Sequence, residues 1–217
     1  MTTLPRTVPK GRLGALRPVW EALAAMTAVQ AVVSMIVIAV PVFAVTAAPD
    51  IGVDARAVGF YTALIYSVSM VSAPIGGYFT DRIGPARASQ ICTLLVMLGI
   101  ALVATARLPL VALGAMLIGA GNGPATPAST YILSRRTPPS LLSLVLTIKQ
   151  TGASIGTALA GILVPLLVIA AGWRGAALAC AGAALAVALM VEPLRRDMDR
   201  EVVAERKAGR EKRPSIF

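Results

Sequence analysis

Long uncharged runs, separated by short charged links, make up most of this chain. Such runs cover residues 22–49, 57–80, 88–106, 108–134 and 175–191, and a sixth run at 137–173 contains a single charge, Lys149. A helix needs about 20 apolar residues to cross a membrane. The pattern therefore predicts an all-α membrane protein with six transmembrane helices, at 22–47, 57–80, 88–106, 110–134, 141–170 and 173–191.

The segments outside these helices are charged. Residues 1–20 form a basic N-terminus and residues 192–217 form a tail with both charge signs, so we expect one transmembrane domain at 21–191. Residues 45–47 resemble a signal-peptide cleavage site. The apolar run before them exceeds the roughly 7–15 residues found in signal peptides. We therefore interpret that run as a retained first helix.

Composition supports the membrane assignment. Of the 217 residues, 57% are hydrophobic and only 14% are charged, whereas soluble domains carry about 25% charged residues. The net charge of +10 would point to nucleic acid in a soluble protein. Here we expect no nucleic-acid partner, because basic segments beside a membrane attract anionic lipid.

The distribution of Lys and Arg predicts the topology. If the N-terminus lies inside, sixteen of the twenty Lys and Arg residues fall on inner segments and three on outer loops. Inner segments of membrane proteins carry the excess of positive charge. We therefore expect a multi-pass protein of the plasma (inner) membrane with both termini in the cytoplasm.

The link between the second and third predicted helices reads GYFTDRIGPAR. Gly77, Asp81, Arg82 and Gly84 fit the pattern G-x-x-x-D-R-x-G, and Arg87 follows as a basic residue. This stretch resembles the signature loop between helices 2 and 3 of the major facilitator superfamily of secondary transporters. The family usually has a basic residue directly after the last glycine, where this chain has proline and alanine.

Three later stretches follow the order seen in that family: the glycine-rich residues 119–127, K-Q-T-G at 149–152, and G-W-R at 172–174. The resemblance covers most of the chain and implies the N-terminal half of a carrier, built as a 3+3 inverted repeat. It implies a half-transporter or truncated carrier that needs a second six-helix half, either another chain or a copy of itself.

The resemblance also implies a role for the link after the second helix. There Asp81 would meet the positive end of a helix in the other half and hold the inner side closed. The alternative is an exposed ion pair with Arg82 or Arg87, which contributes about 0–1 kcal/mol.

Four polar residues lie deep in the predicted helices. At about 1.5 Å per residue, Gln30, Asn122, Lys149 and Gln150 lie near the middle of a core about 30 Å thick. We expect them to line a solute cavity, where Lys149 would suit an anionic group or carry a movable proton. Two alternatives remain: Lys149 could extend towards the inner surface, and the amides of Gln30 and Asn122 could join helices to one another.

Small residues predict a close-packed helix face. Gly152, Gly156 and Ala160 recur every four residues and so share one side of a helix. By contrast, the run at 88–106 consists mostly of Leu, Val, Ile and Ala, and we expect it to face lipid.

The chain has no histidine, which excludes Ser-His hydrolysis and His-based metal sites. We expect no enzyme activity, metal or cofactor. Transport of a small polar solute, with an anion as one option, is the predicted function. The alternative is a non-transporting membrane remnant or scaffold. Proton-linked relatives often have an Arg where this chain has Ala115, and the antiporter pattern G-P-x-x-G-G is not met. Neither proton coupling nor drug efflux is therefore predicted.

Overall fold

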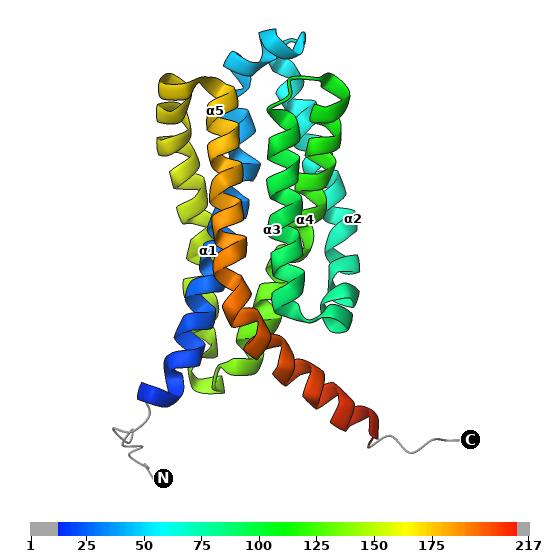
Figure 1. Cartoon of the computed structure of the whole chain (residues 1–217), viewed down its shortest axis with the longest axis vertical. Coiled ribbons are helices and arrows are strands. Elements are labelled where there is room, and N and C mark those ends of the chain that lie inside the picture. The colour runs from blue at the N-terminus through cyan, green and yellow to red at the C-terminus, as the bar shows by residue number, and fades with distance from the viewer. Residues whose placement is uncertain (1–12, 212–217) are drawn as a thin grey trace, which may run out of the picture.

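The chain folds into an all-helical bundle (Figure 1). This computed structural model describes the backbone of residues 13–211 and the side chains of residues 19–76, 78 and 82–193. Its elements are α1 (Leu13–Ile51), η1 (Ala55–Ala57), α2 (Val58–Ile83), α3 (Pro85–Val103), α4 (Leu108–Arg136) and α5 (Pro139–Glu211). The all-α prediction is confirmed. The predicted basic start and charged tail fall partly at 1–12 and 212–217, outside the described residues.

α5 is too long to cross a membrane once. Its apolar part, Pro139–Pro193, has 55 residues, about 80 Å of helix at ~1.5 Å per residue, against a hydrocarbon core of about 30 Å. Gly172 interrupts the helix with φ 71° and ψ 170°, a combination that only glycine adopts without strain. In Figure 1 the yellow part of α5 before this point and the orange part after it run in opposite directions.

The described residues thus contain five helices long and apolar enough to cross a membrane. The sequence predicted six, because it placed separate helices at 141–170 and 173–191. The structure counts these two as one element that reverses at Gly172. The first residues of α1 and the last part of α5 leave the bundle at the same end (Figure 1), here called the termini end.

α2 and α3 are joined by one residue at the termini end. Gly84 has φ 94° and ψ 143°, which again requires glycine. α3 begins directly on Pro85, which has no N–H to leave unbonded at a helix start. The backbone N–H of Ala88 donates to the Gly84 carbonyl at 2.9 Å. The short link predicted from the sequence is therefore shorter still, because helical structure continues through its charged residues.

Among the described helices, α1 is the most buried and α2 the least. α1 contacts every other α-helix and packs most extensively against α5, while α4 packs against α2 and α3. In the most apolar window of each helix, 56% of residues are buried for α1 but only 11% for α2. The exposed sides of α2 must therefore meet lipid or another protein.

The expectation that the third helix faces lipid is wrong for half of its surface. α3 lies between α4 and the later part of α5, and half of its apolar window is buried. Its buried residues include Cys92, Val96 and Ile100. The buried face of α3 could not be predicted from the sequence, because leucine, valine and alanine occupy both sides of the helix.

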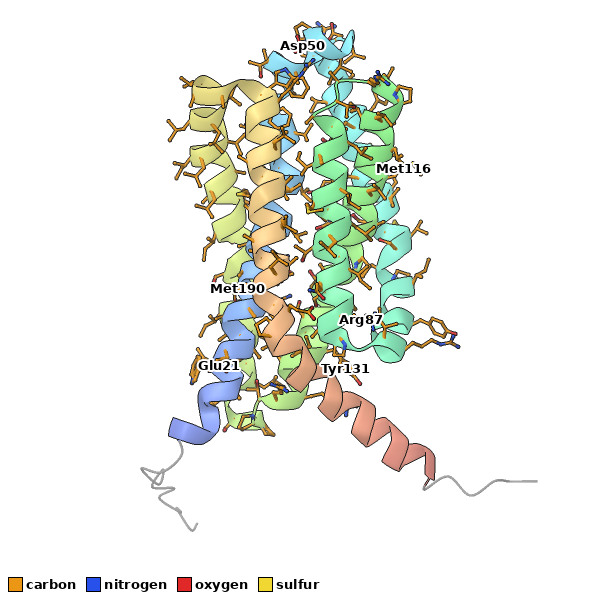
Figure 2. The ribbon with its side chains drawn as sticks, in the orientation of Figure 1. Glu21, Asp50, Arg87, Met116, Tyr131 and Met190 are labelled. Carbon is orange, nitrogen blue, oxygen red and sulfur yellow. The ribbon has the colours of Figure 1, made fainter. Side chains whose placement is uncertain are left out.

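Polar contacts join the helices at both ends of the bundle. At the end that carries Asp50, labelled in Figure 2 and here called the Asp50 end, the indole N–H of Trp173 donates to Asp50 Oδ2 at 2.9 Å. Arg174 Nη2 lies 3.5 Å from the same oxygen. Towards the termini end, the side-chain amide of Gln90 donates to Glu192 Oε2 at 2.8 Å. These contacts connect α1 and α3 to the part of α5 after its reversal.

Candidate functional site

Lys149 lies on α5 and is buried, with 1% of its surface exposed. Its stem runs towards α4, and Nζ lies 3.5 Å from the backbone carbonyl oxygen of Thr126. That separation exceeds the usual N–H···O range of about 2.7–3.2 Å, so the contact is weak. Within the described residues it is the only polar contact recorded for Nζ. Lys149 is therefore buried in the bundle with no carboxylate partner among the side chains that the structure describes.

Thr126 also connects the Lys149 region to α1. Its hydroxyl donates to Gln30 Oε1 at 3.2 Å. Gln30 itself is buried, with 6% of its surface exposed, whereas Thr126 is exposed. Three helices thus meet at one group of polar atoms, and this group reaches the surface at Thr126.

Asn122 lies one turn from Thr126 on α4, so both side chains share a face. Its amide Nδ2 donates to Ser69 Oγ on α2 at 3.1 Å, and Ser69 Oγ donates to the Gly119 carbonyl at 3.1 Å. Asn122 and Thr126 on α4 thus contact one polar residue on each of α1, α2 and α5. We call this group of five the polar stripe: Gln30, Ser69, Asn122, Thr126 and Lys149.

Two prolines add backbone acceptors to this part of α4. Pro124 and Pro127 have no N–H, so the carbonyls of Ala120 and Gly123 lack their usual helical donor. Both of these residues are partly exposed. Membrane helices tolerate such breaks where they line a cavity or are covered by protein. The glycine-rich stretch therefore presents carbonyl oxygens as well as side chains.

Gln150 is the one predicted cavity residue that the structure does not bring to the others. Consecutive residues on a helix point about 100° apart, and Gln150 is exposed while Lys149 is buried. Conversely, Thr126 and Ser69 were not singled out from the sequence. The spacing of four between Asn122 and Thr126 was a signal for a shared polar face.

The predicted small-residue face lies against α1. A Cβ added to Gly152 would lie 2.7 Å from the Thr27 carbonyl oxygen, and one added to Gly156 would overlap the Ala31 carbonyl. Ala160, one turn further along, has no exposed surface. The close approach of α1 and α5 places Lys149 and Gln30 within reach of the same residue of α4.

The predicted gating residues lie at the termini end. The backbone of Gly77 and Asp81 is part of α2, but the Asp81 side chain is not among those that the structure describes. The Arg82 guanidinium lies over the Tyr78 ring, 4.4 Å from its centroid. Arg87 is exposed near the start of α3, close to the termini end of Figure 2. The role of Asp81 stays a prediction.

No group of three His, Cys, Asp or Glu side chains close enough to hold a metal ion occurs among the described residues. The polar stripe instead offers a cation, two amides and hydroxyls on neighbouring membrane helices, and polar groups at that depth are costly and so mark candidate functional sites.

Comparison with known families agrees with the all-helical membrane fold. The family model described as Major Facilitator Superfamily matches residues 22–216. No curated protein matches the chain.

Proposed function

The chain belongs to the major facilitator superfamily, and we propose that it forms one six-helix half of a carrier for a small polar solute. The family consists of transporters, which move solutes by exposing one binding site alternately to the two sides of the membrane. The proposal adds three features: the number of crossings, the site and the class of solute.

We propose six crossings arranged as a 3+3 inverted repeat, with both termini in the cytoplasm of a plasma (inner) membrane protein. The reversal at Gly172 supports a division of α5 into two crossings. α1 begins and α5 leaves at the same end of the bundle (Figure 1), which supports an even number of crossings. The excess of Lys and Arg on the same segments supports a cytoplasmic termini end.

The observation that carries the solute proposal is the buried cation of Lys149 within the polar stripe, which pairs with no described carboxylate. A lysine at the centre of a membrane helix costs about 2.5–3.5 kcal/mol. Its present contact, 3.5 Å from the Thr126 carbonyl, offsets little of that cost. An anionic solute would supply the missing charge, while Asn122 and Gln30 would bond its polar groups. We therefore propose a small organic anion as substrate.

The exposed side of the polar stripe would face a second six-helix unit. Thr126 is exposed although it bonds two other helices, and an exposed polar group at this depth favours a covering of protein or water over lipid. We propose that this unit, a partner or a second copy, completes the cavity. The gate at Asp81 would act between the same two units.

Ligand-induced stabilisation tests the site. Purified protein in detergent would be unfolded thermally with succinate, gluconate or glycerol 3-phosphate, with choline and sorbitol as cationic and neutral comparisons. A ligand at about 100 times its Kd stabilises a protein by ~2.7 kcal/mol. We expect at least one anion to raise the melting temperature, and Lys149→Met to abolish that rise.

Gln150→Leu is the matched control, because it changes the neighbouring exposed residue. It is expected to keep the response to the anion. The stabilising anion would then be tested for uptake into proteoliposomes, where a non-transporting scaffold predicts no flux. Equal stabilisation of wild type and Lys149→Met would refute the proposed site.

A further inference from the structure

Ser69 holds the Asn122 side-chain amide in one orientation. Ser69 lies on α2 and is buried, with 8% of its surface exposed. Its hydroxyl has a single proton, which it donates to the backbone carbonyl of Gly119 at 3.1 Å. The Ser69 oxygen can therefore only accept from Asn122, which lies 3.1 Å away. An amide carries its donors on nitrogen and its acceptor on oxygen, so the nitrogen of Asn122 must face Ser69.

This orientation leaves the Asn122 oxygen, Oδ1, without a partner among the described residues. The opposite holds for Gln30, whose oxygen accepts the Thr126 hydroxyl at 3.2 Å and whose nitrogen, Nε2, has no described partner. The buried polar atoms that lack a partner in the described part of the chain belong to three other side chains. Oδ1 of Asn122 and Nε2 of Gln30 are therefore accessible to a solute rather than sealed inside the bundle.

The polar stripe thus has a donor end and an acceptor end. Lys149 Nζ contacts the Thr126 carbonyl and Gln30 contacts the Thr126 hydroxyl, so both donors lie beside the same residue of α4. The acceptor belongs to Asn122, one turn away, which is about 6 Å at ~1.5 Å per residue. A carboxylate only accepts hydrogen bonds. It therefore suits the donor end and is opposed by the oxygen at the acceptor end.

We propose that the solute is a hydroxycarboxylate whose carboxylate binds Lys149 and Gln30 while its hydroxyl donates to Asn122 Oδ1. This inference rests on the anion site proposed above and adds the second group that the solute must carry. Ser69 acts as a positioning residue, because it prevents the Asn122 amide from turning its nitrogen towards the solute. A dicarboxylate would place oxygen against oxygen at Asn122, and such an unfavourable contact provides specificity.

Three five-carbon anions test the proposal: 5-hydroxypentanoate, pentanoate and glutarate. They share a carboxylate and a chain length, and differ in the other end, which is a hydroxyl, a methyl or a second carboxylate. Purified protein in detergent would be titrated with each by calorimetry. We expect 5-hydroxypentanoate to bind about five-fold more tightly than pentanoate, the factor that one net hydrogen bond gives. Its advantage over glutarate should be at least as large.

Ser69→Ala tests the positioning role. Without the hydroxyl, the Asn122 amide is free to offer its nitrogen to a second carboxylate. The Kd of glutarate divided by the Kd of 5-hydroxypentanoate should then fall by about five-fold or more. Ser69→Thr restores a hydroxyl and should restore the ratio. Ser72→Ala is the matched control, because Ser72 also donates to the Gly119 carbonyl, at 3.2 Å, and makes no described bond to Asn122. It should leave the ratio unchanged.

Asn122→Leu provides a second test that does not depend on Ser69. It removes the acceptor, so 5-hydroxypentanoate and pentanoate should bind equally. An unchanged ratio in Ser69→Ala, or a preference for the hydroxyl that persists in Asn122→Leu, would overturn the inference. So would wild-type protein that binds glutarate as tightly as 5-hydroxypentanoate; if Lys149→Met then binds neither, the anion site itself stands. Equal binding of all three anions by wild type and Lys149→Met would instead overturn the proposed function, and this inference with it.

Discussion

Replacing Gly156 by alanine is expected to push α5 away from α1. The added Cβ would overlap the carbonyl oxygen of Ala31 and lie 2.8 Å from its carbonyl carbon. These are backbone atoms of a neighbouring helix, so the contact cannot be relieved by a side-chain rotation. Overpacking of this kind costs about 1–3 kcal/mol. The same substitution gains up to about 1 kcal/mol of helix propensity, which masks part of the loss.

Gly161→Ala separates the two effects. Gly161 lies five residues further along α5, and an added Cβ meets no atom within 4 Å. Both variants gain the same helix propensity, so the difference between their stabilities reports the packing term alone. We expect Gly156→Ala to be about 1–3 kcal/mol less stable than Gly161→Ala.

Thermal unfolding in detergent measures this difference, with a thiol-reactive dye that reports exposure of the two buried cysteines, Cys92 and Cys180. For a chain of this size, 1 kcal/mol shifts the melting temperature by about 2–4 °C. Equal melting temperatures for Gly156→Ala and Gly161→Ala would show that α1 and α5 are not packed as closely as the structure has them.

Three further outcomes are expected. Trp173→Phe keeps an aromatic ring but removes the N–H that bonds Asp50, and it should lower stability by about 0.5–1.5 kcal/mol; an unchanged melting temperature would contradict this. In a background without native cysteines, Thr126→Cys should react with a membrane-impermeant thiol reagent much faster than Ile162→Cys, which is 63% exposed on an apolar surface; equal rates would place Thr126 against lipid. A reporter fused after Phe217 should be cytoplasmic, and an external reading would remove the six-crossing proposal.

The helices could be predicted because a membrane allows few alternatives. A backbone in lipid must satisfy its own hydrogen bonds, so a long apolar run indicates a helix. Gly84 and Gly172 fall where the chain must turn, and both adopt positive φ angles. Lys149 stood out from the sequence because it interrupts an otherwise uncharged run.

The orientation of each helix could not be predicted in the same way. Lys149 and Gln150 are neighbours in sequence, yet one is buried and the other exposed, and nothing in an apolar context indicates which. Contacts between residues far apart in the sequence could not be predicted either. Asp50 and Trp173 are 123 positions apart, and their pairing depends on how α1 and α5 pack. Ser69 belongs to the candidate site because α2 packs against α4, where the Asn122 amide donates to its hydroxyl.

The contacts of Lys149 support our proposal that it binds solute rather than joins helices. A structural lysine would be expected to make short bonds to several acceptors, but Nζ lies 3.5 Å from one carbonyl. An anion that draws Nζ away from Thr126 would break only this weak contact, and would gain a charge-assisted bond of about 2.7–2.9 Å in its place. The helices remain joined meanwhile, because α1 and α5 meet at Gly152 and Gly156. α1 and α4 also stay bonded through Gln30. These contacts do not involve Lys149, and this supports the proposal that its ammonium group serves a solute rather than the packing of the bundle.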